Sequence, residues 1–119
     1  MKKIKNNERI IKNIYFDEFE RFDSSNSGKG ESIIQLDDSK PLGLGFHIYK
    51  VEPGGFSMAH EHTGDEQFLL IDGDLSDNDG TIYKPGDFVL LKKGTQHNSF
   101  TKNGCLLAVH IEKQEKILN

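Results

Sequence analysis

The sequence predicts an all-β fold, and three observations support this prediction. Turn signals built from Gly, Pro, Asn and Asp recur about every 8–12 residues, the runs between them are short, and no long segment has helical periodicity. The chain has 119 residues, which is the size of one domain. Many short strands with glycine-rich turns are typical of a β-sandwich, a barrel or a double-sheet jelly roll.

The first 29 residues are expected to form an N-terminal arm. Residues 9–16 (RIIKNIYF) contain the apolar side chains of a possible edge strand or lead-in. Residues 17–23 are acidic, and phenylalanines recur every three residues in this part of the chain. This pattern fits either one helical turn or an extended edge. Residues 24–29 are rich in Ser and Gly and are typical of a loop.

Residues 30–112 are expected to form the barrel, with residues 113–119 as a C-terminal tail. Pro53-Gly54-Gly55 and Pro85-Gly86-Asp87 are turn sequences, and Asp77–Gly80 ends in the Asp-Gly pair of a tight hairpin. Apolar or alternating runs between the turns predict strands at residues 31–36, 42–52, 56–62, 67–71, 81–83, 88–91, 97–101 and 105–112.

Composition argues against several classes of protein. The net charge is -4 and the sequence pI is about 5.7, which disfavours a nucleic-acid or anionic membrane surface. No apolar stretch approaches the roughly 18 residues of a membrane span, and the start of the chain lacks the apolar core of a secretory signal. The only cysteine, Cys105, cannot form an internal disulfide. We therefore expect a cytoplasmic protein.

Four residues have the types and spacing of a metal site. His60 and His62 are two positions apart, so on a strand both imidazoles lie on one face and can share an ion. Glu66 follows with a carboxylate, and His97 supplies a third imidazole from further along the chain. Three nitrogens and one oxygen suit Fe(II), Mn, Ni, Cu or Zn, with positions left for water or substrate.

The spacing around these residues resembles the two sequence motifs of the cupin superfamily. Gly54-x₅-His60-x-His62-x₃-Glu66-x₆-Gly73 resembles the first motif at every defining position. Gly86-x₅-Lys92-x-Gly94-x₂-His97-x₃-Thr101 resembles the second at both glycines and at the histidine. It departs at Lys92, where the family usually has proline, and at Thr101, where it usually has asparagine.

The segment from Leu70 to Cys105 looks like one branch of the cupins. That branch contains the metal-binding domain of zinc anti-sigma factors and small acetylacetone-dioxygenase-like enzymes. The resemblance covers residues 30–112 and implies an RmlC-like jelly-roll barrel, also called a double-stranded β-helix. It assigns a divalent metal (Fe, Zn, Mn or Ni) to His60, His62, Glu66 and His97. In some relatives the carboxylate stands off the metal, so binding by the three histidines alone remains open.

Other residues are expected to line or fill the barrel. His47 and His110 lie in expected strands, and each is either a barrel-lining partner of the site or an ordinary packed or exposed residue. Cys105 is expected to be a small buried side chain rather than a reactive thiol. A further set shares parity with the ligands or lies on facing strands, and most of it is expected in the core: Phe56, Met58, Phe68, Leu70, Phe88, Leu90, Ser99 and Thr101.

These features support two main hypotheses of function. The first is a metal-dependent, dioxygenase-like enzyme that acts on a small carbonyl or diketone compound bound in the barrel. The alternative is a non-catalytic cupin that binds a metal or ligand in a sensor or regulatory role. A sugar-nucleotide epimerase or isomerase is less favoured, since those cupins generally do not need the complete ligand set. The resemblance also implies a homodimer, in which residues 9–16 pair with the partner's sheet edge.

Overall fold

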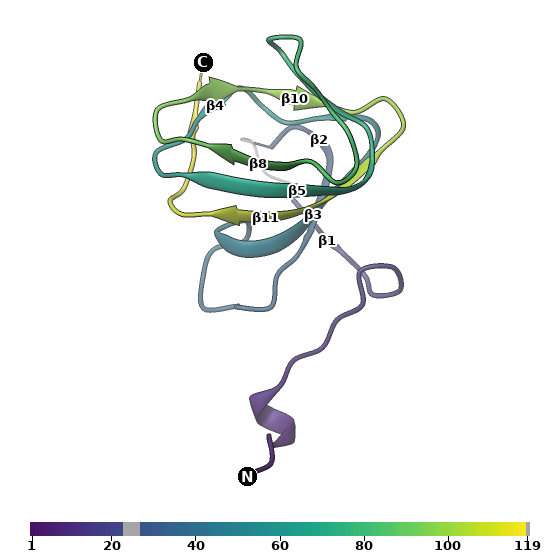
Figure 1. Cartoon of the computed structure of the whole chain (residues 1–119), viewed down its shortest axis with the longest axis vertical. Helices are drawn as coiled ribbons and strands as arrows, with labels where there is room; N and C mark the ends of the chain where they lie inside the picture. Colours follow the sequence, from purple (N-terminus) through teal and green to yellow (C-terminus); the bar gives the residue numbers. More distant parts are fainter. Residues whose placement is uncertain (23–26, 119) are drawn as a thin grey trace.

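The computed structural model describes residues 1–22 and 27–118. It is almost entirely β, with one short helix near the N-terminus (Figure 1). The elements are the 3₁₀ helix η1 (Asn6–Glu8) and the strands β1 (Glu20–Arg21), β2 (Lys29–Ile34), β3 (Gly45–Phe56), β4 (His60–Glu61), β5 (Glu66–Gly73), β6 (Leu75–Asp77), β7 (Ile82–Tyr83), β8 (Phe88–Leu91), β9 (Gln96–His97), β10 (Ser99–Phe100), β11 (Cys105–Ile111) and β12 (Lys116–Ile117).

The strands form two antiparallel sheets that curl around a common core. The larger sheet has the order β7-β6-β10-β3-β11-β5-β8, with β2 pairing on β3 and β1 on β2. The smaller sheet has the order β12-β4-β9. The prediction of an all-β barrel is therefore confirmed.

The core lies inside the curve of the larger sheet. Leu70 is fully buried, and Phe68 packs edge-on against Tyr83 with ring centroids 5.1 Å apart. The cluster also contains Val51, Leu75, Cys105, Leu107 and Val109. Alternation along β5 and β11 explains this, because successive side chains on a strand point to opposite faces.

Three expected core residues are exposed instead, and one of them is Phe56, which is 39% exposed. Phe88 is 76% exposed and Leu90 is 51% exposed. In the ladder between β5 and β8, Leu69 pairs with Phe88 and Gln67 pairs with Leu90. Partners opposite each other in a ladder share a face, and Gln67 and Leu69 both point outward. The predicted parity of β8 was therefore wrong by one residue, a slip that moves every side chain to the other face.

Pro53-Gly54-Gly55 does not reverse the chain, so this predicted turn was also wrong. β3 continues through it to Phe56, and the irregularity falls where the β2–β3 register shifts between Lys29 and Glu31. Val51, before the irregularity, pairs with β11, whereas Phe56, after it, pairs with β10. The Pro-Gly-Gly sequence thus lets one long strand change partners, which is a common use of these residues inside strands.

The structure also tests the predicted hairpin and the two ends of the chain. Asp77–Gly80 joins β6 to β7 as the expected hairpin. β1 shows that the segment around residues 20–21 is extended rather than helical. Residues 23–26, which include half of the expected loop at residues 24–29, lie outside the described residues. Residues 9–16 pair with no described strand of this chain, and β12 is a strand for which residues 113–119 gave no signal.

Candidate metal centre

Strand pairing in the smaller sheet brings the predicted histidines together. His60 on β4 lies directly opposite His97 on β9. The backbone N–H of His62 donates to the carbonyl of Thr95 at 2.9 Å, and that of Gly94 donates to the carbonyl of His62 at 2.7 Å. Because side chains of directly opposed residues share a face, the ladder itself places His97 beside the His60–His62 pair.

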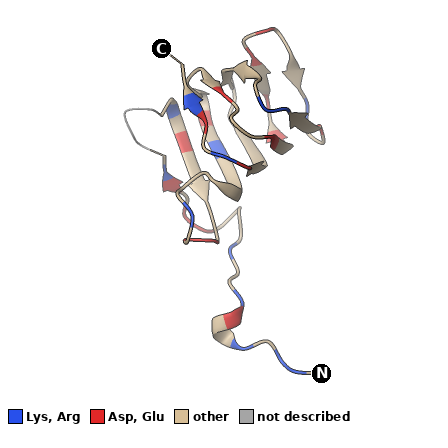
Figure 2. Cartoon of the chain, turned by 90° about the vertical axis from the view of Figure 1, so that its left-hand side faces the viewer, with Lys and Arg blue, Asp and Glu red and all other residues tan. Residues whose placement is uncertain are grey.

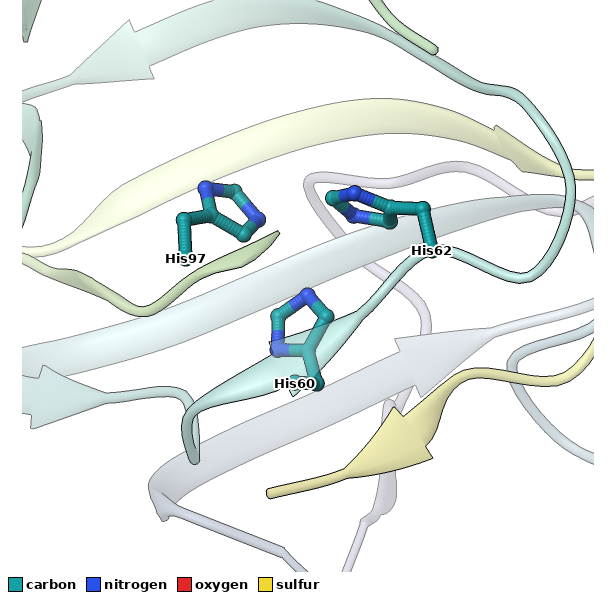
Figure 3. Close-up of side chains that lie close together, drawn as sticks. All are labelled: His60, His62 and His97. Carbon is teal, nitrogen blue, oxygen red and sulfur yellow. The ribbon is translucent and has the colours of Figure 1, made fainter. Parts of the chain in front are cut away.

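The three imidazole rings point toward one another (Figure 3). Their centroids are 4.7 Å apart for His60 and His97, 4.9 Å for His62 and His97, and 5.0 Å for His60 and His62. One nitrogen from each ring lies within 4.8 Å of the other two. His60 and His62 are buried, and the His97 side chain is 12% exposed. This cluster could hold a metal ion.

Hydrogen bonds fix which nitrogen of His60 and His62 faces the cluster. His60 Nδ1 donates to the carbonyl of Met58 at 2.7 Å. Thr95 Oγ1 donates its own proton to the carbonyl of Lys92, so it accepts one from His62 Nδ1 at 2.9 Å. Both rings therefore carry their proton on Nδ1 and leave a lone pair on Nε2. Metal-bound histidines usually donate the proton of their other ring nitrogen to a neighbouring oxygen in this way.

His97 has the equivalent partner in Asp77. Nδ1 of His97 lies 3.0 Å from Oδ2 of Asp77, close enough for an ion pair although the N–H does not point straight at the oxygen. Asp77 also accepts hydrogen bonds from Tyr83, at 2.6 Å, and from Ser99. Burial raises the pKa of Asp77, but these contacts with His97, Ser99 and Tyr83 outweigh burial and lower it overall, so the carboxylate is ionised.

Two carboxylates, rather than one, reach the imidazoles. Oε1 of Glu66, at the start of β5, lies 3.5 Å from Nε2 of His62. Oε1 of Glu115, just before β12, lies 3.6 Å from Nε2 of His60. Donor atoms of these four residues lie within 4.8 Å of one another, whereas His97 groups with the other two histidines only. The structure therefore brings the three predicted imidazoles together and places Glu66 at their edge.

The pKa values follow from burial and from the two glutamates. Burial lowers the pKa of His60. Burial also acts to lower that of His62, but the carboxylate of Glu66 outweighs it and the net shift is upward. Burial, followed by the charge of Glu66, raises the pKa of Glu115 to about 8. The lowered pKa of His60 favours the neutral imidazole that binds a metal.

A cavity of about 310 Å³ opens beside the cluster. His60, His97, Glu66 and Glu115 form part of its wall. Most of the remaining wall is apolar and includes Phe22, Ile33, Leu42, Phe68, Leu75, Leu107, Val109 and Ile111. An apolar cavity with a few polar groups at one side is the usual form of a small-molecule site.

The other histidines and the cysteine lie in different parts of the barrel. His47 is buried, lines the cavity, and has a pKa lowered by burial, whereas His110 is exposed. Cys105 is buried in the core, and burial raises the pKa of its thiol to about 12, in agreement with a packing role. Tyr49 donates a hydrogen bond to Glu31 in the cavity wall.

Sequence reasoning missed Asp77, Thr95 and Glu115. Asp77 and Thr95 belong to turn sequences, where Asp and Thr are common for local reasons, so their contact with a histidine gave no distinct signal. Glu115 lies in a charged segment after the last expected strand. Only the pairing of β12 with β4 brings it to the site, and no motif predicts that pairing.

Comparisons with known proteins agree with this fold. A family model described as the ChrR cupin-like domain matches residues 21–114. An acetylacetone dioxygenase from Acinetobacter johnsonii is similar in structure, with a TM-score of 0.77 and 15% identity over 100% of this chain and 83% of that chain. The polyketide cyclase RemF from Streptomyces resistomycificus has a TM-score of 0.70 and 17% identity over 92% of this chain and 87% of that one.

A third structure, Rhodobacter sphaeroides SigE in complex with the anti-sigma ChrR, has a TM-score of 0.63 and 16% identity over 82% of this chain and 49% of that chain. No curated protein matches the sequence significantly. At such identities the solved structures establish the fold alone, a cupin jelly roll, and say nothing of the reaction. The family model covers most of the sequence, and we conclude that the chain belongs to the ChrR cupin-like domain family.

Proposed function

We propose that the protein is a metal-binding cupin whose ion is held by His60, His62, Glu66 and His97. The observation that carries this proposal is the convergence of three imidazoles in a buried cluster. Nε2 of His62 is buried and has no hydrogen-bond partner among the described residues. A buried polar atom without a partner is costly, and a bound cation would satisfy it. The donor set fits Fe, Zn, Mn or Ni.

We further propose a dioxygenase-like reaction on a small carbonyl or diketone compound. The chemistry supplied by a bound ion would be the polarisation of substrate oxygens and, for iron, access to O₂. The cavity beside His60 and His97 supports this proposal, because its volume and apolar wall suit a small organic molecule. The structural similarity to an acetylacetone dioxygenase supports the same class of substrate.

The protein's own residues would orient the reactants and exclude water. Met58 and Thr95 accept the Nδ1 protons of His60 and His62, and Asp77 lies 3.0 Å from Nδ1 of His97. These contacts would keep the rings in a fixed orientation. Phe68 and Leu107 contribute to the dry side of the cavity. Glu66 lines the cavity beside His62, so this proposed metal ligand also borders the space for a substrate.

Oxygen consumption tests the enzymatic proposal. The protein is reconstituted with Fe(II) without oxygen and then supplied with O₂ and a panel of β-diketones and phenolic ketones. We expect substrate-dependent O₂ uptake by the wild-type protein and none by His97→Ala. His110→Ala, which changes an exposed histidine, is the matched control and should retain the activity. Uptake no faster than that of His97→Ala with every compound would reject the proposal.

The match to a ChrR cupin-like domain, together with the similarity to the anti-sigma ChrR, favours a second candidate, a metal-dependent sensor or regulator. In this case the ion would serve structure and signalling rather than turnover. Tightly bound zinc with all its coordination positions filled by the protein would support this candidate. X-ray absorption spectroscopy of the purified protein measures the number and type of ligands. An open position occupied by water would favour the enzyme instead.

We also propose that the protein forms a homodimer through its N-terminal arm. The chain before Tyr15 extends away from the barrel (Figure 1) and carries mainly basic charges (Figure 2), whereas the Tyr15 hydroxyl donates a hydrogen bond to Asp72 of β5 at 3.3 Å. Ile11 and Phe16 on this arm are 77% and 89% exposed, and Ile10 and Tyr15 are also exposed. Apolar side chains placed along an extended arm are expected to be covered by a partner.

Deleting residues 1–16 tests the role of the arm. We expect the mass in solution, measured by light scattering, to fall from that of a dimer to that of a monomer. The control is a variant that removes charge but keeps the apolar surface, in which Ser replaces Lys2, Lys3 and Lys5. A dimer that persists after the deletion would reject the arm as the interface.

A further inference from the structure

The segment after β11 is fastened across the metal centre. β12 pairs antiparallel with β4, so that Ile117 lies opposite His60 and Lys116 lies opposite Glu61. The N–H of Leu118 donates to the carbonyl of Ala59 at 2.9 Å, and the hydroxyl of Thr63 donates to the carbonyl of Gln114 at 2.6 Å. Hydrogen bonds at both ends of residues 114–118 therefore fix the position of this segment beside the His60–His62 pair.

This register directs the side chain of Glu115 into the cavity. The side chain is 26% exposed, and its Oε1 lies 3.6 Å from Nε2 of His60. Glu66 Oε1 lies at a similar distance, 3.5 Å, from Nε2 of His62. Ligands that sit about 2.1 Å from a common ion are about 3.0–3.4 Å from their neighbours, so these separations suit atoms that share one ion.

The charges around Glu115 also favour a cation. Glu66 and Glu115 both line the cavity, and no lysine or arginine is among the described residues of its wall. Buried carboxylates in proteins are usually paired with a basic side chain or coordinate a metal. Nε2 of His60 faces Glu115 and Nε2 of His62 faces Glu66, and lone pairs on these nitrogens can share a cation with the two carboxylates.

We propose that Glu115 is a further metal ligand, supplied by the C-terminal strand and additional to the three histidines and Glu66. This inference rests on the proposed metal-binding function. The arrangement gives the ion two overlapping donor sets: the three imidazoles, or His60 and His62 with Glu66 and Glu115. Binding by Glu115 would link β12 to the metal.

Titration with Co(II) tests this role without measuring activity. Wild-type protein, Glu115→Gln and Glu115→Asp are titrated, and both the dissociation constant and the visible absorption of bound Co(II) are recorded. Glu112→Gln is the matched control, because it removes an exposed carboxylate three residues earlier in the same segment. Circular dichroism confirms that each variant is folded, and Glu115→Asp decides the test if Glu115→Gln does not fold.

We expect Glu115→Gln to weaken Co(II) binding at least about tenfold and to change the absorption spectrum, because removing a ligand changes the coordination number. Glu115→Asp should have an intermediate effect, and Glu112→Gln should match the wild type. If the wild type binds one Co(II), His97→Ala loses it, and the Glu115 variants behave like the wild type, the role of Glu115 is rejected while the metal centre stands. If the wild type binds no Co(II), both proposals fall.

Discussion

At the scale of single residues, the site depends on the neighbours of the imidazoles as much as on the imidazoles. Each histidine presents Nε2 to the cluster because a different group engages its Nδ1: the carbonyl of Met58, the hydroxyl of Thr95 and the carboxylate of Asp77. Only Asp77 carries a charge. It is held by Tyr83 and Ser99 as well, so its position does not depend on His97 alone.

Replacing Asp77 should therefore weaken metal binding through His97. We expect Asp77→Asn to reduce zinc affinity about 10- to 100-fold, because the amide cannot both keep its present hydrogen bonds and accept the proton of His97 Nδ1. Competition with a chromophoric chelator measures this affinity. Asp79→Asn, an exposed position in the same hairpin turn, is the control. Equal affinities for the two variants would contradict the positioning role.

Glu31 makes stability depend on pH. Burial raises the pKa of its carboxyl from the ordinary value of 4.5, and hydrogen bonds from Tyr49 and the N–H of Gly28 offset only part of this effect. The folded protein thus holds the proton to a higher pH than the unfolded chain does. The stability that this proton contributes is fully present below about pH 4.5 and is lost as pH rises through the folded pKa.

Glu31→Gln, which cannot ionise, should therefore gain stability relative to the wild type as the pH is raised from 4 to 7. Thermal melting of chelator-treated protein across this range measures the difference. Glu52→Gln, which removes an exposed glutamate from neighbouring β3, is the matched control. A difference between Glu31→Gln and wild type that stays constant or shrinks with rising pH would be inconsistent with this account.

At the scale of elements, local sequence patterns predicted some strands and turns but not which distant strands pair with each other. The His60–His62 pair, the Asp77–Gly80 hairpin and the bounds of β8 were predictable, since these signals act over a few residues. The faces on which the side chains of β8 lie were not predicted correctly. The path of β3 through Pro53-Gly54-Gly55 was not, because the exchange of β11 for β10 as its partner is a long-range event. The same holds for β12, whose register with β4 decides where Glu115 points.

Gly73, at the end of β5, is a place where backbone geometry excludes a side chain. Its φ is +90°, and a Cβ would lie 2.0 Å from the carbonyl oxygen of Gly104. Gly80 has the same φ, but no atom lies within 4 Å of a Cβ built there. An alanine at position 80 would therefore show the cost of backbone strain alone, without a steric clash. We expect Gly80→Ala to cost roughly 1–2 kcal/mol of unfolding free energy. Gly73→Ala should cost at least about 3 kcal/mol, since β5 must also move from β11.

Chemical denaturation measures both glycine variants. The comparison is informative because the two sites share a backbone conformation, and the additional loss at Gly73 reports the close approach of residues 73 and 104. Equal losses for the two variants would show that the strands separate at little cost.

At the scale of the whole molecule, the ion would join parts of the chain that are distant in sequence. His60 and His62 lie around β4, Glu66 begins β5, and His97 ends β9. β5 belongs to the larger sheet, whereas β4 and β9 belong to the smaller one. A shared ion would thus connect the two sheets. Among the described residues no helix is long and apolar enough to cross a membrane.

Metal removal should lower the melting temperature substantially. At a free metal concentration about 1,000 times the dissociation constant, binding stabilises the folded state by about 4 kcal/mol. For a domain of this length that corresponds to a shift of roughly 10–20 °C. Differential scanning calorimetry with and without chelator measures it. His97→Ala should show little response to chelator, and an equal response in this variant would place the stabilising ion elsewhere.

The smaller sheet has a consequence for local opening of the native protein. β4, β9 and β12 contain two residues each, so few ladder hydrogen bonds hold them, whereas β3, β5 and β11 are long and packed on the core. Without an ion, the amides of His62, Gly94 and Leu118 should exchange with solvent deuterium much faster than those of Leu107 and Val109. Adding metal should slow exchange at the first three amides and leave the last two nearly unchanged. The ion would then determine how often the smaller sheet opens locally. It would also affect the rate at which solvent and small molecules enter the cavity.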